Sequence, residues 1–128
     1  MSAPLNESLR HAAAQAVSSL AELSGVVAVV VATADGFDMA SSVSRGVDAA
    51  RVAAMASSIA AIGAVVVQEG RLTGCRHVTV GANDGFVHVA AVDRSDVQLV
   101  INVIADGNAI LAQVAYGAAE QARRLAAA

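Results

Sequence analysis

Apolar residues in this chain follow two spacings that alternate along the sequence. Residues 26–33 form a nearly unbroken run of valine and alanine, and residues 97–105 are apolar at most positions. Such runs are typical of strands covered on both faces of a sheet. Elsewhere apolar residues recur three and four positions apart, which is typical of helices. The predicted elements, in chain order, are a helix (5–23), two strands (26–33 and 37–41), a helix (48–68), three strands (75–81, 86–92 and 97–105) and a helix from 108 onward.

Residues with known preferences for helix ends support two of these helices. Pro4 and Glu7 suit the first turn of the first helix, and Gly25 suits the position after its end. Asp48 is expected to cap the start of the second helix, with Gly70 beyond its last turn.

The two strands that are apolar on both faces most simply lie side by side at the centre of one sheet. Tight hairpin turns at residues 35–36 and 83–85 then place the other strands outward. The predicted fold is a single α+β domain over residues 1–128, with a five-stranded antiparallel sheet in the order 2-1-5-4-3 and helices on both faces. Residues 106–108 are expected to cap the final helix, whose apolar stripe is Leu111, Val114, Ala118 and Leu125.

The second helix carries two adjacent apolar stripes. The bulkier stripe is expected to pack on the sheet and comprises Val52, Met55, Ile59, Ile62 and Val66. The other stripe has mostly small side chains and is expected to face away from the sheet, as a dimer interface made of Ala53, Ala56, Ala60, Gly63 and Val67. Small side chains allow two helix backbones to approach closely, so the same helix of a second copy is the expected partner. The third strand, at the sheet edge, is expected to pair with its own copy.

A membrane span and a solvent-exposed face are the alternatives for this helix. No charge lies between Arg51 and Glu69, but the uncharged stretch is shorter than the roughly 18 to 20 residues of a span. Alanine has the highest helix propensity and is also tolerated on exposed faces. The limited size of apolar patches on soluble monomers favours self-association over an exposed face.

Composition excludes several functions. The chain has 128 residues and a net charge of −3, and it has no basic cluster, which argues against nucleic acid as a partner. One tyrosine, two phenylalanines and no tryptophan leave little for bases to stack on. The single cysteine excludes an internal disulfide and favours the reducing cytoplasm, and no signal peptide is visible.

No catalytic or cofactor motif is present, so no catalytic, cofactor-binding or metal-binding residue is expected. Phosphate-binding glycine loops, metalloprotease motifs and nucleophile elbows are all missing. One constellation is worth testing. If Gly81 pairs with Phe86, then one face of the sheet carries three side chains that could form part of a zinc site: Cys75, His77 and His88. Because a fourth ligand is lacking, ordinary side chains near a sheet edge are the preferred interpretation.

The order of elements resembles the Roadblock family of dynein-light-chain-like domains, which includes the bacterial MglB proteins. The resemblance lies in residues 23–41, 51–63 and 85–105. Gly25 and Val26 before an apolar strand, followed by Asp35 and Gly36, match the opening that is typical of this family.

The resemblance implies a non-enzymatic homodimer without a cofactor, which partners a small Ras-like GTPase in bacteria. It carries over no catalytic residue and no arginine finger. A structural adaptor that does not affect GTP hydrolysis is the alternative. A small-molecule sensor is disfavoured because few aromatic and convergent polar residues fall in the predicted core.

Overall fold

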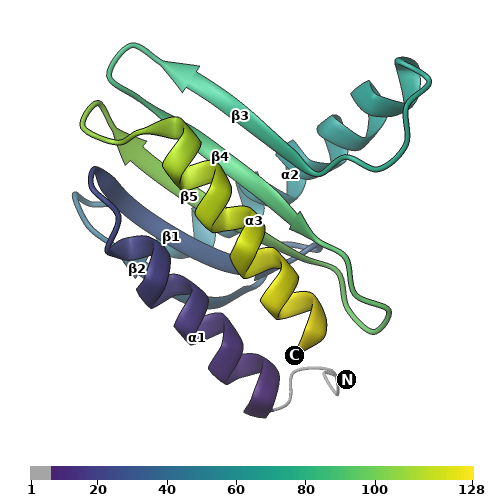
Figure 1. Ribbon diagram of the computed structural model, residues 1–128, viewed down its shortest axis with the longest axis horizontal. Coiled ribbons are helices and arrows are strands. Elements are labelled where there is room, and N and C mark those ends of the chain that lie inside the picture. The colour runs from purple at the N-terminus through teal and green to yellow at the C-terminus, as the bar shows by residue number, and fades with distance from the viewer. Residues whose placement is uncertain (1–6) are drawn as a thin grey trace.

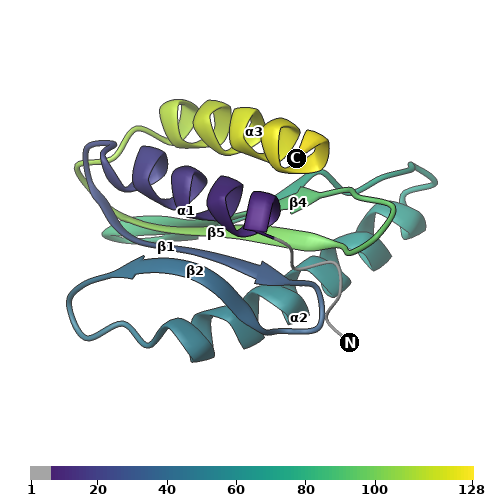
Figure 2. The same cartoon turned by 90° about the horizontal axis from the view of Figure 1, so that it is seen from below.

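Five antiparallel strands form one sheet between two layers of helices, as Figures 1 and 2 show. The computed structural model describes residues 7–128. The elements are α1 (Glu7–Ala21), β1 (Val26–Thr33), β2 (Asp38–Val43), α2 (Ala49–Glu69), β3 (His77–Ala82), β4 (Gly85–Val92), β5 (Leu99–Asp106) and α3 (Leu111–Ala127). The predicted strand order is confirmed: β2-β1-β5-β4-β3.

The central pair of strands is the one that the apolar runs predict. β1 pairs with β5 along most of its length, from Val26 opposite Ala105 to Thr33 opposite Leu99. Six consecutive residues of β1, from Ala28 to Thr33, are buried. Hairpins then place β2 beyond β1 and β3 beyond β4, so that β2 and β3 are the edges of the sheet.

Helices α1 and α3 lie together on one face of the sheet, and α2 lies alone on the other (Figure 2). The core between the sheet and the α1–α3 layer contains Leu9, Leu20, Val103, Val114 and Leu125 among its fully buried side chains. The α2 side has a smaller core. One helix therefore covers a sheet face of the same extent as the face that two helices cover.

Helix ends agree with the sequence at α2 and differ at α3. The Asp48 side chain accepts hydrogen bonds from the backbone N–H groups of Ala50 and Arg51. The N-cap of α3 is Ile110, which has no side-chain cap, so the predicted cap at residues 106–108 is wrong. The backbone N–H of Asn108 instead donates to the Asp106 carboxylate within the preceding turn. Pro4 and Leu5, on which part of the α1 prediction rests, lie outside the described residues.

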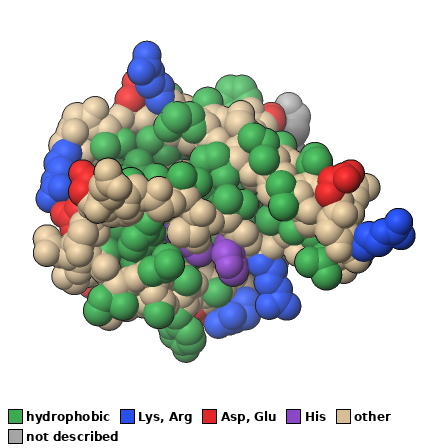
Figure 3. All heavy atoms as spheres, turned by 90° about the horizontal axis from the view of Figure 1, so that it is seen from above, with side chains coloured by type: hydrophobic (Ala, Val, Ile, Leu, Met, Phe, Trp, Pro, Cys, Tyr) green, Lys and Arg blue, Asp and Glu red, His purple; other side chains and the backbone are tan. Residues whose placement is uncertain are grey.

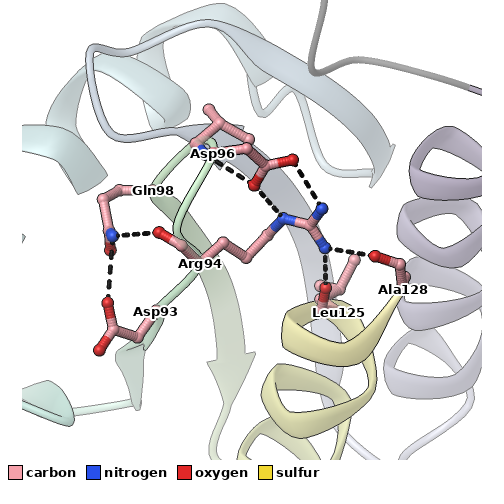
Figure 4. Close-up of polar contacts among 7 residues, drawn as sticks. Asp93, Arg94, Asp96, Gln98, Leu125 and Ala128 are labelled. Carbon is pink, nitrogen blue, oxygen red and sulfur yellow. Dashed lines mark hydrogen bonds and ion pairs between the residues drawn. The ribbon is translucent and has the colours of Figure 1, made fainter.

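Arg94 connects the β4–β5 turn to the end of α3 (Figure 4). Its Nε and Nη2 atoms both donate to the Asp96 carboxylate at 2.8 Å, and Nη1 donates to the backbone oxygens of Leu125 and Ala128. The Arg94 hydrogen bonds lower the pKa of Asp96 to about 2. A guanidinium at a helix C-terminus satisfies carbonyl groups that have no partner within the helix. Arg94 therefore holds the last turn of α3 against the sheet.

We expect Gly25→Ala to destabilise the fold by about 2–4 kcal/mol, because two penalties combine there. Gly25 has φ of +82°, and a Cβ at this position would lie 2.3 Å from the Ala109 backbone nitrogen. Gly46→Ala is the matched control, since Gly46 has φ of +73° but no atom within 4 Å of the point that a Cβ would occupy. Gly46→Ala should cost only about 1 kcal/mol. Equal losses in urea unfolding would contradict the close approach at Gly25.

Candidate interaction surface

Helix α2 packs on the sheet through its small residues. Ala53 and Ala56 are both 0% exposed, and Gly63 is also buried. Ala60 and Val67 are half-buried, and Ala60 packs against the same core. The prediction that these residues face away from the sheet is therefore wrong. The stripe expected to form a dimer interface is the inner face of α2.

The bulkier stripe divides between the inside and the outside of the fold. Val52 is buried and Ile59 is half-buried against the sheet, as expected. Met55, Ile62 and Val66 are 55%, 65% and 64% exposed, contrary to expectation. The strands already supply bulky side chains to this core, so the helix contributes small ones and approaches closely.

Gly63 is the residue in the sequence that points to this orientation. A Cβ on Gly63 would lie 2.6 Å from Val78 Cγ2 and 2.9 Å from Cys75 Sγ. Only glycine allows the middle of α2 to come this near to β3. Glycine inside a helix costs about 1 kcal/mol relative to alanine, so its presence marks a close contact.

Strand β3 is the less protected edge of the sheet. It pairs only with β4 among the described residues, and it has no Asp, Glu or Arg. Most of its residues are exposed, including Val80 at 47%. The opposite edge, β2, begins with Asp38 and carries Ser41 and Ser42. Unpaired apolar edges tend to bind further strands, and charged or polar residues oppose this tendency.

A groove of about 400 Å³ runs between α2 and β3 and joins these two features into one surface. Its walls are almost entirely apolar, and they are formed by Ile59, Ile62, Gly63, Val66, Val67, Cys75, His77, Val78 and Val80. We call this groove, together with the exposed residues Met55 and Val65 of α2, the α2–β3 surface. Figure 3 looks down on the β3 edge, which lies at the top of Figure 1, and shows many hydrophobic side chains gathered on the α2–β3 surface.

The family follows from the sequence match. The Roadblock/LC7 domain matches residues 12–105, most of the chain. The chain belongs to the Roadblock/LC7 family. No protein with a curated description matches the sequence. The match ends at Ala105, so α3 lies beyond the part of this Roadblock domain that the family match covers.

Several solved structures share the fold. A Roadblock/LC7 domain from Streptomyces avermitilis has a TM-score of 0.77 and 19% identity, over 88% of this chain and 92% of that chain. The gliding protein MglB from Thermus thermophilus has a TM-score of 0.81 and 12% identity, over 96% and 92%. A structure described as MglB with tetrameric arrangement has a TM-score of 0.81 and 14% identity, over 96% and 91%. At these identities the likeness shows the fold.

Helix α2 of this Roadblock domain is long and apolar enough to cross a membrane, judged by length and composition alone. The helix itself has 21 residues, so it is longer than its uncharged stretch and its length does not exclude a span. Its contact with the sheet is what separates it from an isolated span, because Val52, Ala53 and Ala56 are buried there. Its outer side remains an apolar surface without a cover.

The predicted grouping of Cys75, His77 and His88 on one face is wrong. Gly81 does pair with Phe86, and the His77 and His88 rings lie 5.1 Å apart. Cys75, however, precedes β3, and its sulfur lies on the other side of the sheet, near Gly63 of α2. Within residues 7–128, no three His, Cys, Asp or Glu side chains form a group that could hold a metal ion.

Two arginines of this Roadblock domain are held by carboxylates within the fold. Arg94 is held by Asp96, and Arg45 donates to the Asp106 carboxylate at 2.9 Å. Arg51, Arg71 and Arg76 are exposed and form no ion pair with another described residue. Of these, Arg51 lies on α2 itself and Arg71 follows its end.

The orientation of α2 predicts opposite outcomes for two neighbouring alanines. Ala56→Glu would place a carboxylate against the sheet, which should cost about 3–5 kcal/mol and unfold much of the protein. Ala61→Glu introduces the same charge on the exposed side of the same helix and should leave the fold intact. Circular dichroism and thermal melting of both variants measure this difference. An Ala56→Glu protein that is as stable as the Ala61→Glu protein would contradict this orientation of α2.

Proposed function

We propose that this Roadblock domain is a non-enzymatic homodimeric interaction module that regulates a small Ras-like GTPase in the bacterial cytoplasm. The α2–β3 surface carries the proposal. Met55, Ile62, Val65 and Val66 are each more than half exposed. Ile62 and Val66 also line the groove beside β3, an edge strand of the sheet. An apolar surface of this kind on a soluble protein calls for a protein partner.

A second copy of the chain fits both parts of this surface. Antiparallel pairing of β3 with its copy would continue the sheet and satisfy the free backbone groups of the edge. The same symmetry brings the two α2 helices together, so that the exposed side of each covers the other. Specific dimers bury roughly 1,200–2,000 Å² in total, which a strand pair and a helix pair can supply together. The MglB structure with a tetrameric arrangement supports self-association of this fold.

The GTPase role rests on the resemblance to the Roadblock family and its MglB-like members. The dimer would bind the GTPase and change its conformation without donating a catalytic group. The Thr79 hydroxyl and the His88 ring are in contact, but no carboxylate within residues 7–128 contacts His88 to orient it as a base. The arrangement therefore supports binding rather than catalysis. The reducing cytoplasm suits both a Ras-like partner and a free Cys75.

Dimerisation through the α2–β3 surface predicts that Ile62→Glu yields a folded monomer. Ile62 is 65% exposed and lines the groove, so the charge is harmless in the monomer but would be buried in the dimer. Tyr116→Glu is the matched control, because Tyr116 is 69% exposed but lies on α3, in the opposite layer. Sedimentation velocity at micromolar concentration should show dimers for the wild type and for Tyr116→Glu. A monomeric wild type, or a dimeric Ile62→Glu protein, would contradict this interface.

The regulatory role predicts that the protein changes the rate of GTP hydrolysis by a Ras-like GTPase encoded next to its gene. Arg51→Ala and Arg71→Ala should retain the effect to within about threefold, because an arginine finger is worth about 10³–10⁵ in rate. Ile62→Glu should lose the effect. The measurement is phosphate release under single turnover, with Tyr116→Glu as the positive control. Binding to the GTPase without any change in the hydrolysis rate would assign the protein to the adaptor class. A thousand-fold loss of the rate effect in one arginine variant would show that this arginine acts as a catalytic group, which contradicts the proposal.

A further inference from the structure

A second cavity lies on the other face of the sheet, between α3 and the strands β3 and β4. Its volume is about 800 Å³, twice that of the groove beside α2. We call it the α3 cavity. The residues of its lining that matter here are Arg76, His77, His88, Asp93, Ala119 and Arg123. Part of this lining comes from α3, which lies beyond the Roadblock family match.

Two arginines at this cavity have no internal partner. Arg76 and Arg123 are exposed and form no ion pair within residues 7–128, whereas Arg45, Arg94 and Arg124 each pair with a carboxylate. The one carboxylate that lines the cavity, Asp93, accepts a hydrogen bond from the Gln98 amide at 3.0 Å. The chain has no lysine, so the blue side chains beside the histidines in Figure 3 are arginines. The cavity is therefore locally positive in a chain of net charge −3.

A histidine that is almost fully buried, His88, also lines this cavity. The residue is 2% exposed, and its Nδ1 lies 2.8 Å from the Thr79 hydroxyl oxygen. Its Nε2 has no hydrogen-bond partner among the described residues, and the side chain lines the cavity. Burial lowers the pKa of His88, and the charge of His77 lowers it further, so the ring is neutral at pH 7. When the Thr79 hydroxyl donates to Nδ1, Nε2 carries the ring proton and can donate it to a ligand.

The remaining wall suits a polypeptide rather than a single small anion. Ala115, Ala119 and Ala122 form the α3 side, which allows an extended backbone to approach closely. A cavity of about 800 Å³ is far larger than one phosphate needs and lies in the range of 300–1,000 Å³ that holds larger ligands. The lining also lacks a helix N-terminus, the usual phosphate-binding element, and includes Arg123 near the C-terminal end of α3.

We propose that the α3 cavity binds an acidic peptide segment of a partner protein. Its carboxylates pair with Arg76 and Arg123, its small apolar side chains contact the alanines of α3, and a carbonyl group accepts a hydrogen bond from His88 Nε2. Charge-assisted pairs between guanidinium and carboxylate groups give such a site both affinity and orientation. The cavity and the groove beside α2 share Cys75 and His77, but Arg76, His88 and Arg123 line the cavity alone, so this proposal does not rest on the dimer.

The test uses a capped peptide of alternating glutamate and alanine, with a glutamine–alanine peptide as the neutral control. Fluorescence anisotropy at low ionic strength measures binding to the full chain. We expect the glutamate peptide to bind and the glutamine peptide not to bind. In the double variant Arg76→Gln, Arg123→Gln, affinity should fall by about tenfold or more. The matched double variant Arg10→Gln, Arg51→Gln removes the same charge from exposed positions elsewhere and should change affinity by less than about threefold.

A second measurement tests the place of binding without altering His88, whose replacement could disturb the sheet. The imidazole NMR signals of His88 should shift with the glutamate peptide and stay unchanged with the glutamine peptide. Ile62→Glu should bind the peptide as the wild type does, which separates this site from the proposed dimer. Equal binding of both peptides, no binding, or equal losses in the two double variants would overturn the proposal. Inorganic phosphate that binds as tightly as the peptide would also overturn it, in favour of a small oxyanion.

Discussion

Strands β1 and β5 lie side by side at the centre of the sheet, and each presents apolar side chains to both faces. Both faces of the sheet must therefore be covered by helices. Residues 7–128 form three helices for this purpose, and two of them, α1 and α3, share one face. Helix α2 alone covers the other. The open apolar surface beside α2 and the exposed edge of β3 both follow from this unequal division.

Helix α2 packs closely on the sheet through small residues, and its bulky residues therefore cover little of the sheet. Ala53, Ala56 and Gly63 bring its backbone near the strands, and Ser57 donates a hydrogen bond to the backbone oxygen of Ala34. The cost is that Met55, Ile62 and Val66 stay more than half exposed, so an isolated monomer leaves most of their apolar surface in water. A partner that covers these side chains buries the apolar surface that the monomer leaves exposed. The self-association that we propose is thus a consequence of how the monomer packs.

Much of the fold follows from the sequence because its strongest signals are local. The run at Val26–Thr33 marks β1 from its first residue to its last, and the turn glycines set the pairing that places Thr79 opposite His88. The orientation of α2 could not be read in the same way, because both of its stripes are apolar and the choice depends on the side chains of all five strands. The face of Cys75 could not be predicted either, because side chains alternate between the two faces only within β3, and Cys75 precedes that strand. Arg76 and Arg123 line one cavity only because α3 packs on β4, the strand that pairs with β3.

Hydrogen–deuterium exchange of the two edge strands at several protein concentrations tests the central claim most directly, since β2 and β3 are edges of the same sheet. If a second copy pairs with β3, its outward backbone amides should become protected as the concentration rises through the dimerisation range. The amides of β2 should exchange at the same rate throughout. Equal exchange of β3 at every concentration, with a monomeric mass, would contradict the account, as would protection that develops at β2 instead.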